Sequence, residues 1–279
     1  MSDGAGKVPK GQKRKAWLLA GSIAVLIVLA VSFEQLRRHG NRQRLIAEIE
    51  RAGGGVLLPD PVWVRLWKSR GQLRQFPVEG TVVALNGPAF DDAWLRAHDD
   101  LVGLRASDLH LSDTNISAAG LARLVEAQPI SYLAVRPSDF SDVTARALTR
   151  HPQLKHLELY EVPLSDDVLT LLPPEELKIL SLHGTTVTPA GLRHLQRCEQ
   201  LYELTLDVAQ LDQVTAANLQ LIPQLIDLRL TGEDVTDEHA RLLHGMTGLQ
   251  SIYFEGTSVT EKARTELALA NLGCAVGVE

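Results

Sequence analysis

Residues 177–192 read LKILSLHGTTVTPAGL, and this stretch decides the fold. Leu180 and Leu182 flank Ser181, which is typical of a short strand whose alternate side chains point into a core. Thr188 then precedes an apolar pattern with helical spacing, and its side-chain oxygen can accept a hydrogen bond from a free helix N–H. The stretch therefore predicts a unit that consists of a strand, a turn and a helix.

The same unit recurs through most of the chain. Apolar pairs equivalent to Leu180 and Leu182 begin, from Val83 onward, at intervals of 26, 24, 24, 23, 24, 24 and 24 residues. The pairs are Val83/Leu85, Leu109/Leu111, Leu133/Val135, Leu157/Leu159, Leu180/Leu182, Leu204/Leu206, Leu228/Leu230 and Ile252/Phe254. Each is followed at a constant distance by a residue of helix-capping type: Asp91, Ser117, Ser141, Ser165, Thr188, Asp212, Thr236 and Thr260. One unit alone cannot bury its apolar side, so we expect the copies to stack into a solenoid.

These motifs resemble those of a known family. The spacing Leu177-x-x-Leu180-x-Leu182-x-x-Thr185-x-Val187 fits the leucine-rich repeat, and residues 185–192 resemble the T-x-V-T-x-x-G-L core of bacterial repeats of the ribonuclease-inhibitor-like and F-box-like type. The resemblance covers about residues 80–270. It implies an α/β leucine-rich-repeat solenoid, with a curved parallel β-sheet on the concave face and helices on the convex face. It also implies that the protein binds another protein or a ligand and does not catalyse a reaction.

Three repeats depart from the family pattern at the position of Thr185. Val162, Ala209 and Glu233 stand there instead. We expect their turns to lack the side-chain hydrogen bond that a threonine or asparagine supplies at this position.

The N-terminal region predicts a membrane anchor. Residues 1–15 form a basic tail, and residues 16–33 contain no charged side chain. Eighteen helical residues are just long enough to cross a hydrocarbon core of about 30 Å. We predict a single transmembrane signal anchor, with a cleaved signal peptide as the alternative. Five basic residues lie on either side of the segment, but a short basic tail favours the cytoplasm, which would place the repeats outside.

Two further segments complete the predicted domain organisation. Residues 34–79 are predicted to hold a juxtamembrane helix that ends at Gly53, a short strand around Val56, and a cap in which Trp63 and Trp67 share one helix face. Residues 80–279 are predicted to form the repeat domain, with about eight repeats and a C-terminal cap. Arg264, in the last helix, stands where earlier helices have an apolar residue, as the polar outer face of a terminal repeat requires.

Charge and motifs argue against several functions. The net charge of −6 divides into +6 for residues 1–52 and −12 for residues 53–279, which disfavours nucleic acid as a partner of the repeats. The sequence contains no GxSxG, HExxH, Walker or CxxC motif, so we expect no catalytic, cofactor or metal site and no enzymatic activity. Cys198 and Cys274 lie about three repeats apart, which predicts buried thiols without a disulfide. His239 and His244 are five residues apart and should not share a metal ion.

The concave face is where the sequence predicts function. Outward positions of neighbouring strands should bring together five side chains: Tyr132, Arg136, His156, Tyr160 and His183. Tyrosine and arginine are common in interface hot spots, so this patch predicts the binding of a protein or peptide. Glu203, Asp207 and Asp227 should form an acidic neighbour. Three alternatives stay open: a cell-wall or polysaccharide-binding surface, a cytoplasm-facing scaffold in signalling, and a solvated sheet face without a partner.

Overall fold

The computed structural model describes residues 33–34, 37–58, 80–136, 138–207, 211–222 and 224–278. The chain divides into two compact units, Met1–Ala47 and Glu48–Glu279. Residues 37–51 are helical, as predicted, and the helix ends before Gly53. Gly53 has a φ of 99°, a conformation that favours glycine after a helix.

Several predictions for the N-terminal region lie outside the described residues. These are the basic tail, the anchor at residues 16–33 apart from Phe33, and the pair Trp63 and Trp67. Among the residues that the structure does describe, no helix is both long enough and apolar enough to span a membrane.

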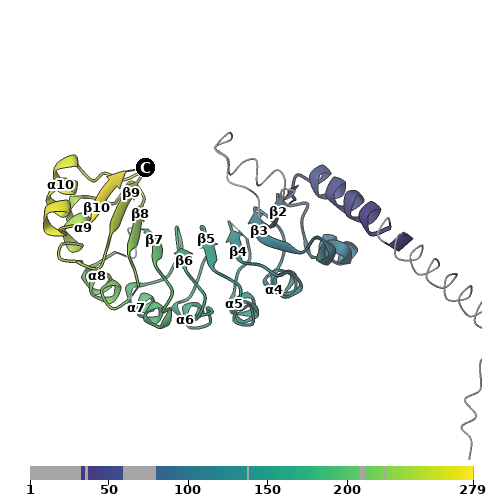
Figure 1. Ribbon diagram of the computed structural model, residues 1–279, viewed down its shortest axis with the longest axis horizontal. Coiled ribbons are helices and arrows are strands. Elements are labelled where there is room, and N and C mark those ends of the chain that lie inside the picture. Colours follow the sequence, from purple (N-terminus) through teal and green to yellow (C-terminus); the bar gives the residue numbers. More distant parts are fainter. Residues whose placement is uncertain are drawn as a thin grey trace, which may run out of the picture. The chain divides into compact units, whose positions relative to one another are not determined.

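The second unit contains one sheet of ten strands arranged in chain order (Figure 1). Strand β1 (Gly55–Leu57) pairs antiparallel with β2 (Thr81–Asn86), and every later pair is parallel. The later strands are β3 (Ala106–Ser112), β4 (Tyr132–Val135), β5 (His156–Leu159), β6 (Ile179–Ser181), β7 (Glu203–Asp207), β8 (Asp227–Thr231), β9 (Ser251–Glu255) and β10 (Ala275–Val278). The predicted α/β solenoid with a parallel sheet is therefore confirmed, and β1 is the short strand predicted around Val56.

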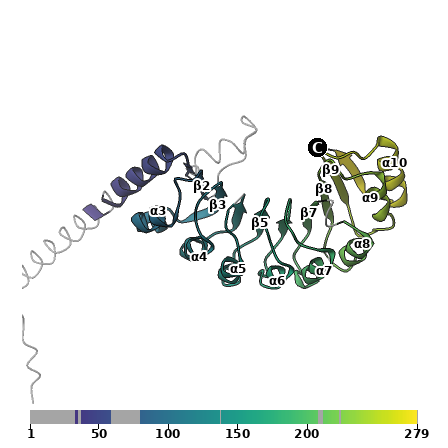
Figure 2. The same ribbon diagram turned by 180° about the vertical axis from the view of Figure 1, so that it is seen from behind.

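Helices cover the convex side of this sheet in both views (Figures 1 and 2). They are α3 (Asp92–Ala97), η2 (Asp99–Leu104), α4 (Ala118–Ala127), α5 (Asp142–Leu148), α6 (Asp166–Leu169), α7 (Pro189–Leu192), η3 (Arg193–Arg197), α8 (Gln213–Leu219), α9 (Asp237–Leu242) and α10 (Glu261–Ala270). Each of the eight predicted capping residues is the N-cap of an α-helix. In α3, α4, α5, α8 and α10 the cap side chain accepts a hydrogen bond from a backbone N–H in the first turn.

Strand β10 was not predicted from the sequence. It pairs in parallel with β9, and Val276 and Val278 lie beside Ile252 and Phe254. This register continues the step of 24 residues by one more strand. The signal was present in the spacing of Val276 and Val278, but the pair contains no leucine.

The core consists of the predicted apolar columns. Leu180, Leu182, Leu204 and Leu206 are completely buried, as are their equivalents in neighbouring strands. Cys198 and Cys274 are free and buried, as predicted. Burial raises the pKa of the Cys198 thiol to about 11, so this thiol is protonated at neutral pH.

A repeated carboxylate contact joins neighbouring helices on the convex side. Asp166, at the start of α6, accepts hydrogen bonds from the amide (2.8 Å) and the hydroxyl (2.6 Å) of Thr188, the N-cap of α7. Asp92 holds Ser117 in the same way, and Asp237 holds Thr260. The Ser117 hydroxyl and amide keep the pKa of Asp92 below its usual value.

The same contact explains the glycine of the T-x-x-G-L motif. A Cβ atom on Gly191 would lie 2.3 Å from Oδ1 of Asp166, and one on Gly120 would lie 2.1 Å from Oδ1 of Asp92. The carboxylate therefore occupies the space that a larger residue would need.

Candidate functional site on the concave face

The strand registers place the predicted patch on the adjacent strands β4–β6 and on the residues that follow them. Tyr132 of β4 is aligned with His156 of β5, and His156 is aligned with Ile179 of β6. The rings of Tyr132 and His156 meet edge to face, with centroids 4.3 Å apart. The rings of Tyr160 and His183 are stacked, with centroids 4.1 Å apart. The five predicted residues therefore form two aromatic clusters, and their binding role stays a prediction.

The first cluster contains two residues that the sequence analysis left out of the patch. His110 lies against Tyr132, with ring centroids 4.7 Å apart. Oε1 of Glu158 lies 3.1 Å from Nε2 of His156, and the same carboxylate interacts with Tyr132. Ala134 stands between His110 and Glu158 in the register and is only 2% exposed. Because Leu133 and Val135 point inward, strand alternation predicts that Ala134 faces solvent, but it is buried beside the larger side chains of its neighbours.

The protonation states within this cluster follow from its burial. Burial raises the pKa of Tyr132 above its usual value, and the nearby Glu158 adds to the effect. The hydrogen bond from His156 lowers the pKa of Glu158, with a further contribution from Tyr132. At neutral pH Tyr132 is therefore neutral and Glu158 carries a negative charge.

The second cluster is a stack of three side chains. The guanidinium of Arg136 lies over the ring of Tyr160, with Cζ 5.1 Å from the centroid, and Tyr160 stacks on His183. Nδ1 of His183 is 2.5 Å from Oγ1 of Thr231, which belongs to β8. Thr231 is itself buried, although strand alternation after the inward-pointing Leu230 predicts that it faces outward. The contact with Thr231 thus fixes the stack from β8, two strands beyond β6. The side chains of the stack therefore lose little further conformational freedom when a ligand binds.

Burial of His110 leads to a prediction about stability against pH. Burial lowers the pKa of His110, and Arg136 and His156 act in the same direction, against the opposing charges of Glu158 and Asp108. The unfolded chain, with a histidine pKa of about 6.5, then binds more protons than the folded chain as the pH falls. We expect the free energy of unfolding to decrease between about pH 7.5 and about pH 5.5, and less steeply in His110→Gln.

Urea unfolding at the two pH values measures this effect. Burial also lowers the pKa of His151. The free energy of unfolding of His110→Gln should therefore still depend on pH, and that of the double variant His110→Gln/His151→Gln should depend on it less. An identical slope in wild type and His110→Gln would contradict the prediction.

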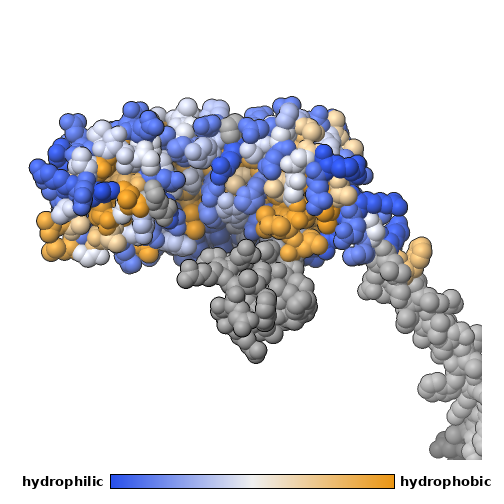
Figure 3. Space-filling view, turned by 90° about the horizontal axis from the view of Figure 1, so that it is seen from above, coloured by the Kyte–Doolittle hydropathy of each residue, from blue (hydrophilic) through white to orange (hydrophobic). Residues whose placement is uncertain are grey.

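A hollow with a volume of about 510 Å³ adjoins both clusters. Its residues come from the turn after β4, from the successive strands β5–β9 and from the turns after them: Arg136, His156, Glu158, Tyr160, Ile179, Ser181, His183, Glu203, Thr205, Arg229, Thr231, Gly232, Glu233, Glu255 and Gly256. Figure 3 views the molecule from the concave side of Figure 1 and shows hydrophilic residues over much of the visible surface. The hollow was not predicted, because it depends on side-chain lengths in three neighbouring columns.

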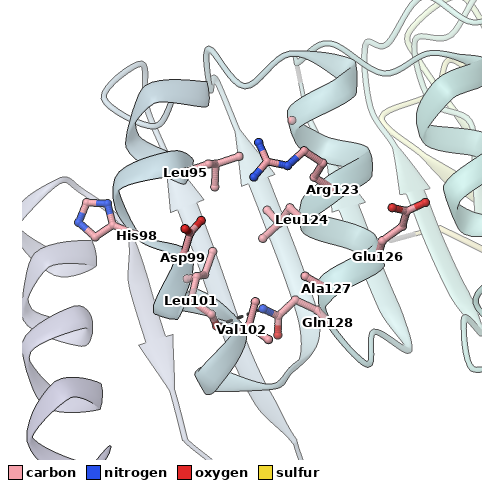
Figure 4. A pocket seen from close by; sticks show the side chains of 11 residues that line it. Leu95, His98, Asp99, Leu101, Val102, Arg123, Leu124, Glu126, Ala127 and Gln128 are labelled. Atoms are coloured by element: carbon pink, nitrogen blue, oxygen red, sulfur yellow. Dashed lines mark hydrogen bonds between the residues drawn. The ribbon is translucent and has the colours of Figure 1, made fainter.

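A second pocket, of about 320 Å³, lies on the convex side between α3, η2 and α4 (Figure 4). Leu95, Leu101 and Leu124 line it, and the amide of Gln128 closes one end by donating to the carbonyl of Leu101 at 3.1 Å. His98 and Glu126 border it but point away from its centre in Figure 4. The pocket is therefore mainly apolar, with Asp99, Arg123 and Gln128 as polar groups in its lining.

Within the described parts of the chain, no group of three or more His, Cys, Asp or Glu side chains could hold a metal ion. His239 instead caps its own helix, with Nδ1 3.1 Å from the amide nitrogen of Thr236. The contacts at the concave face are suited to binding through hydrogen bonds, aromatic surfaces and charge.

Similarity to known proteins is found among solved structures. No family model and no curated protein matches the sequence. Among solved structures, an internalin from Listeria monocytogenes is similar over 63% of this chain and 49% of its own, with 16% identity and a TM-score of 0.40. A TLR13–ssRNA13 complex is similar over 57% of this chain and 27% of its own, with 19% identity and a TM-score of 0.42.

The repeat step, the register and the order of the strands decide the fold class. The chain has a leucine-rich-repeat fold. It spans about half the length of the internalin chain and about a quarter of the TLR13 chain. The function must therefore be argued from the concave site itself.

Proposed function

We propose that this protein is a membrane-anchored, non-catalytic binding module whose concave sheet face binds a protein or peptide. The observation that carries the proposal is the pair of pre-organised aromatic clusters on β3–β6 and the residues that follow these strands. Tyrosine and arginine side chains supply much of the binding energy in protein interfaces. Here Tyr132, Tyr160 and Arg136 are held by neighbours before any partner arrives, which reduces the entropy lost on binding.

Alanine substitution tests this proposal directly. The triple variant Tyr132→Ala/His156→Ala/Tyr160→Ala should lose the capture of a specific partner from extracts, because it removes both clusters. The matched control is Arg146→Ala/Thr149→Ala/Arg150→Ala, which changes three exposed residues at the end of α5 on the convex side. Urea unfolding of both variants checks that the fold is kept. Capture that is unchanged in the first variant would overturn the proposal.

The anchor and the location of the repeats are part of the same proposal. The uncharged residues 16–33 and the basic residues on both sides support a signal anchor, with the repeat domain outside the cytoplasm. Reporter fusions at the C-terminus, each active on one side of the membrane, measure the orientation. A reporter that is active only in the cytoplasm would favour a cytoplasm-facing scaffold.

A polysaccharide is the second candidate ligand. The concave site combines aromatic rings with carboxylates such as Glu158 and Glu203, and this combination can also hold sugars. A glycan array separates the two classes of ligand. Nucleic acid is disfavoured, because residues 53–279 carry a net charge of −12.

A further inference from the structure

The hollow on the concave face has a defined shape because of one strand column. Along the register, Glu158 of β5, Ser181 of β6, Thr205 of β7 and Arg229 of β8 follow one another. Two short side chains therefore stand between two long ones. Ser181 and Thr205 form a low floor with hydroxyl groups, and the longer side chains form walls. A volume of about 510 Å³ is large enough for a long side chain and part of its peptide backbone.

The two arginines that line the hollow are both engaged with other groups. Arg229 lies 3.1 Å from Oε1 of Glu203 through Nε, and its Cζ is 5.0 Å from the ring centroid of Tyr253. Arg136 lies over Tyr160. These contacts keep both guanidinium groups beside the side chains that form the walls of the hollow.

The carboxylates of the hollow outnumber its guanidinium groups. Four glutamates line it against two arginines, so its charge is negative when the histidines are neutral. Glu158 and Glu203 have partners in His156 and Arg229. Glu233 and Glu255 are exposed, and within the described residues neither side chain has a hydrogen-bond or ion-pair partner.

Glu233 is one of the departures from the repeat pattern. At the equivalent position Thr185 is buried and donates a hydrogen bond to the carbonyl of Leu182 at 3.0 Å. Glu233 follows Gly232, whose φ is 108°, and its side chain is exposed at the border of the hollow. The replacement thus removes an internal hydrogen bond and adds a negative charge beside Glu255.

We propose that this hollow binds a basic peptide segment, with a lysine or arginine side chain that enters it between Glu233, Glu255 and the hydroxyl floor. The proposal rests on the proposed function and specifies the chemistry of the partner. A positively charged side chain matches the excess of carboxylates, and Ser181 and Thr205 can accept hydrogen bonds from it. A peptide backbone can continue along the open concave face toward the aromatic clusters.

Fluorescence anisotropy of labelled peptides with the full chain tests this proposal. The probes are peptides of equal length that alternate glycine with lysine, with glutamate or with serine. We expect the lysine peptide to bind, with an affinity that decreases as salt is added. The double variant Glu233→Gln/Glu255→Gln should bind it about tenfold more weakly, because two attractive charges are lost.

The control is Glu261→Gln/Glu266→Gln on α10, which changes the net charge equally on the convex side. An equal loss in both variants would overturn the proposal, since it would reflect overall charge alone. Equal binding of the lysine and glutamate peptides, or binding of a polysaccharide without the lysine peptide, would also overturn it. If the lysine peptide fails to bind while the triple alanine variant still loses its natural partner, the binding function stands and the basic partner does not.

Discussion

Leu204→Ala is expected to lower the free energy of unfolding by about 2–5 kcal/mol, because it leaves a cavity in a close-packed core. Leu204 is completely buried in β7, and its register partners are Leu180 and Leu228. Each repeat is stabilised by its neighbours, so a cavity in the central repeats weakens the coupling between the two halves of the solenoid. Urea unfolding followed by circular dichroism measures the loss.

Thr205→Ala is the matched control for this prediction. Thr205 is the next residue of the same strand and lies on the concave side, where it is partly exposed. We expect its replacement to change the free energy of unfolding by less than about 0.5 kcal/mol. Similar losses in the two variants would contradict the inward direction of the leucine columns.

Gly191→Ala is expected to destabilise the protein by about 1–3 kcal/mol, although alanine is the better helix former. The new Cβ would displace the carboxylate of Asp166 and break its two hydrogen bonds to Thr188. Asp166→Ala alone should cost about 1–2 kcal/mol through the same bonds. In the Asp166→Ala background the Gly191→Ala change should cost less than in the wild type, because only the Cβ of residue 166, at 2.9 Å, still crowds the new Cβ.

A double-mutant cycle in urea unfolding measures this coupling between the two positions. Gly103→Ala serves as the control, because no atom lies within 4 Å of the position of its Cβ. Additive effects of Asp166→Ala and Gly191→Ala would show that the Asp166 carboxylate is not the reason why position 191 requires a glycine.

The sequence predicted the fold in detail because its signals are local and repeated. Each strand was marked by a pair of apolar residues and each α-helix by an N-cap residue, and a step of about 24 residues placed every strand beside the next. Strand β10 was missed because Val276 and Val278 are a weaker form of the same pair. The burial of Ala134 and Thr231 was missed because it depends on neighbouring side chains, which cover both residues.

The candidate site could be predicted only in part. Strand register was enough to bring Tyr132 close to His156, and Tyr160 close to His183. It was not enough to show that Glu158 joins His156 and Tyr132, since this depends on the rotamers of three side chains. The hollow had a signal in the sequence, the short residues Ser181 and Thr205 between Glu158 and Arg229, but its depth required the structure.

The strictly sequential order of the sheet has a consequence for how the chain folds. Each strand pairs only with the strand before and the strand after it in the chain, so the strand contacts join residues about 24 positions apart. Such short loops cost little closure entropy, and a structured repeat offers a complete template to the next one. Any two adjacent repeats can therefore nucleate folding. Further repeats can then fold onto them toward either end of the chain, without a contact between residues distant in the sequence.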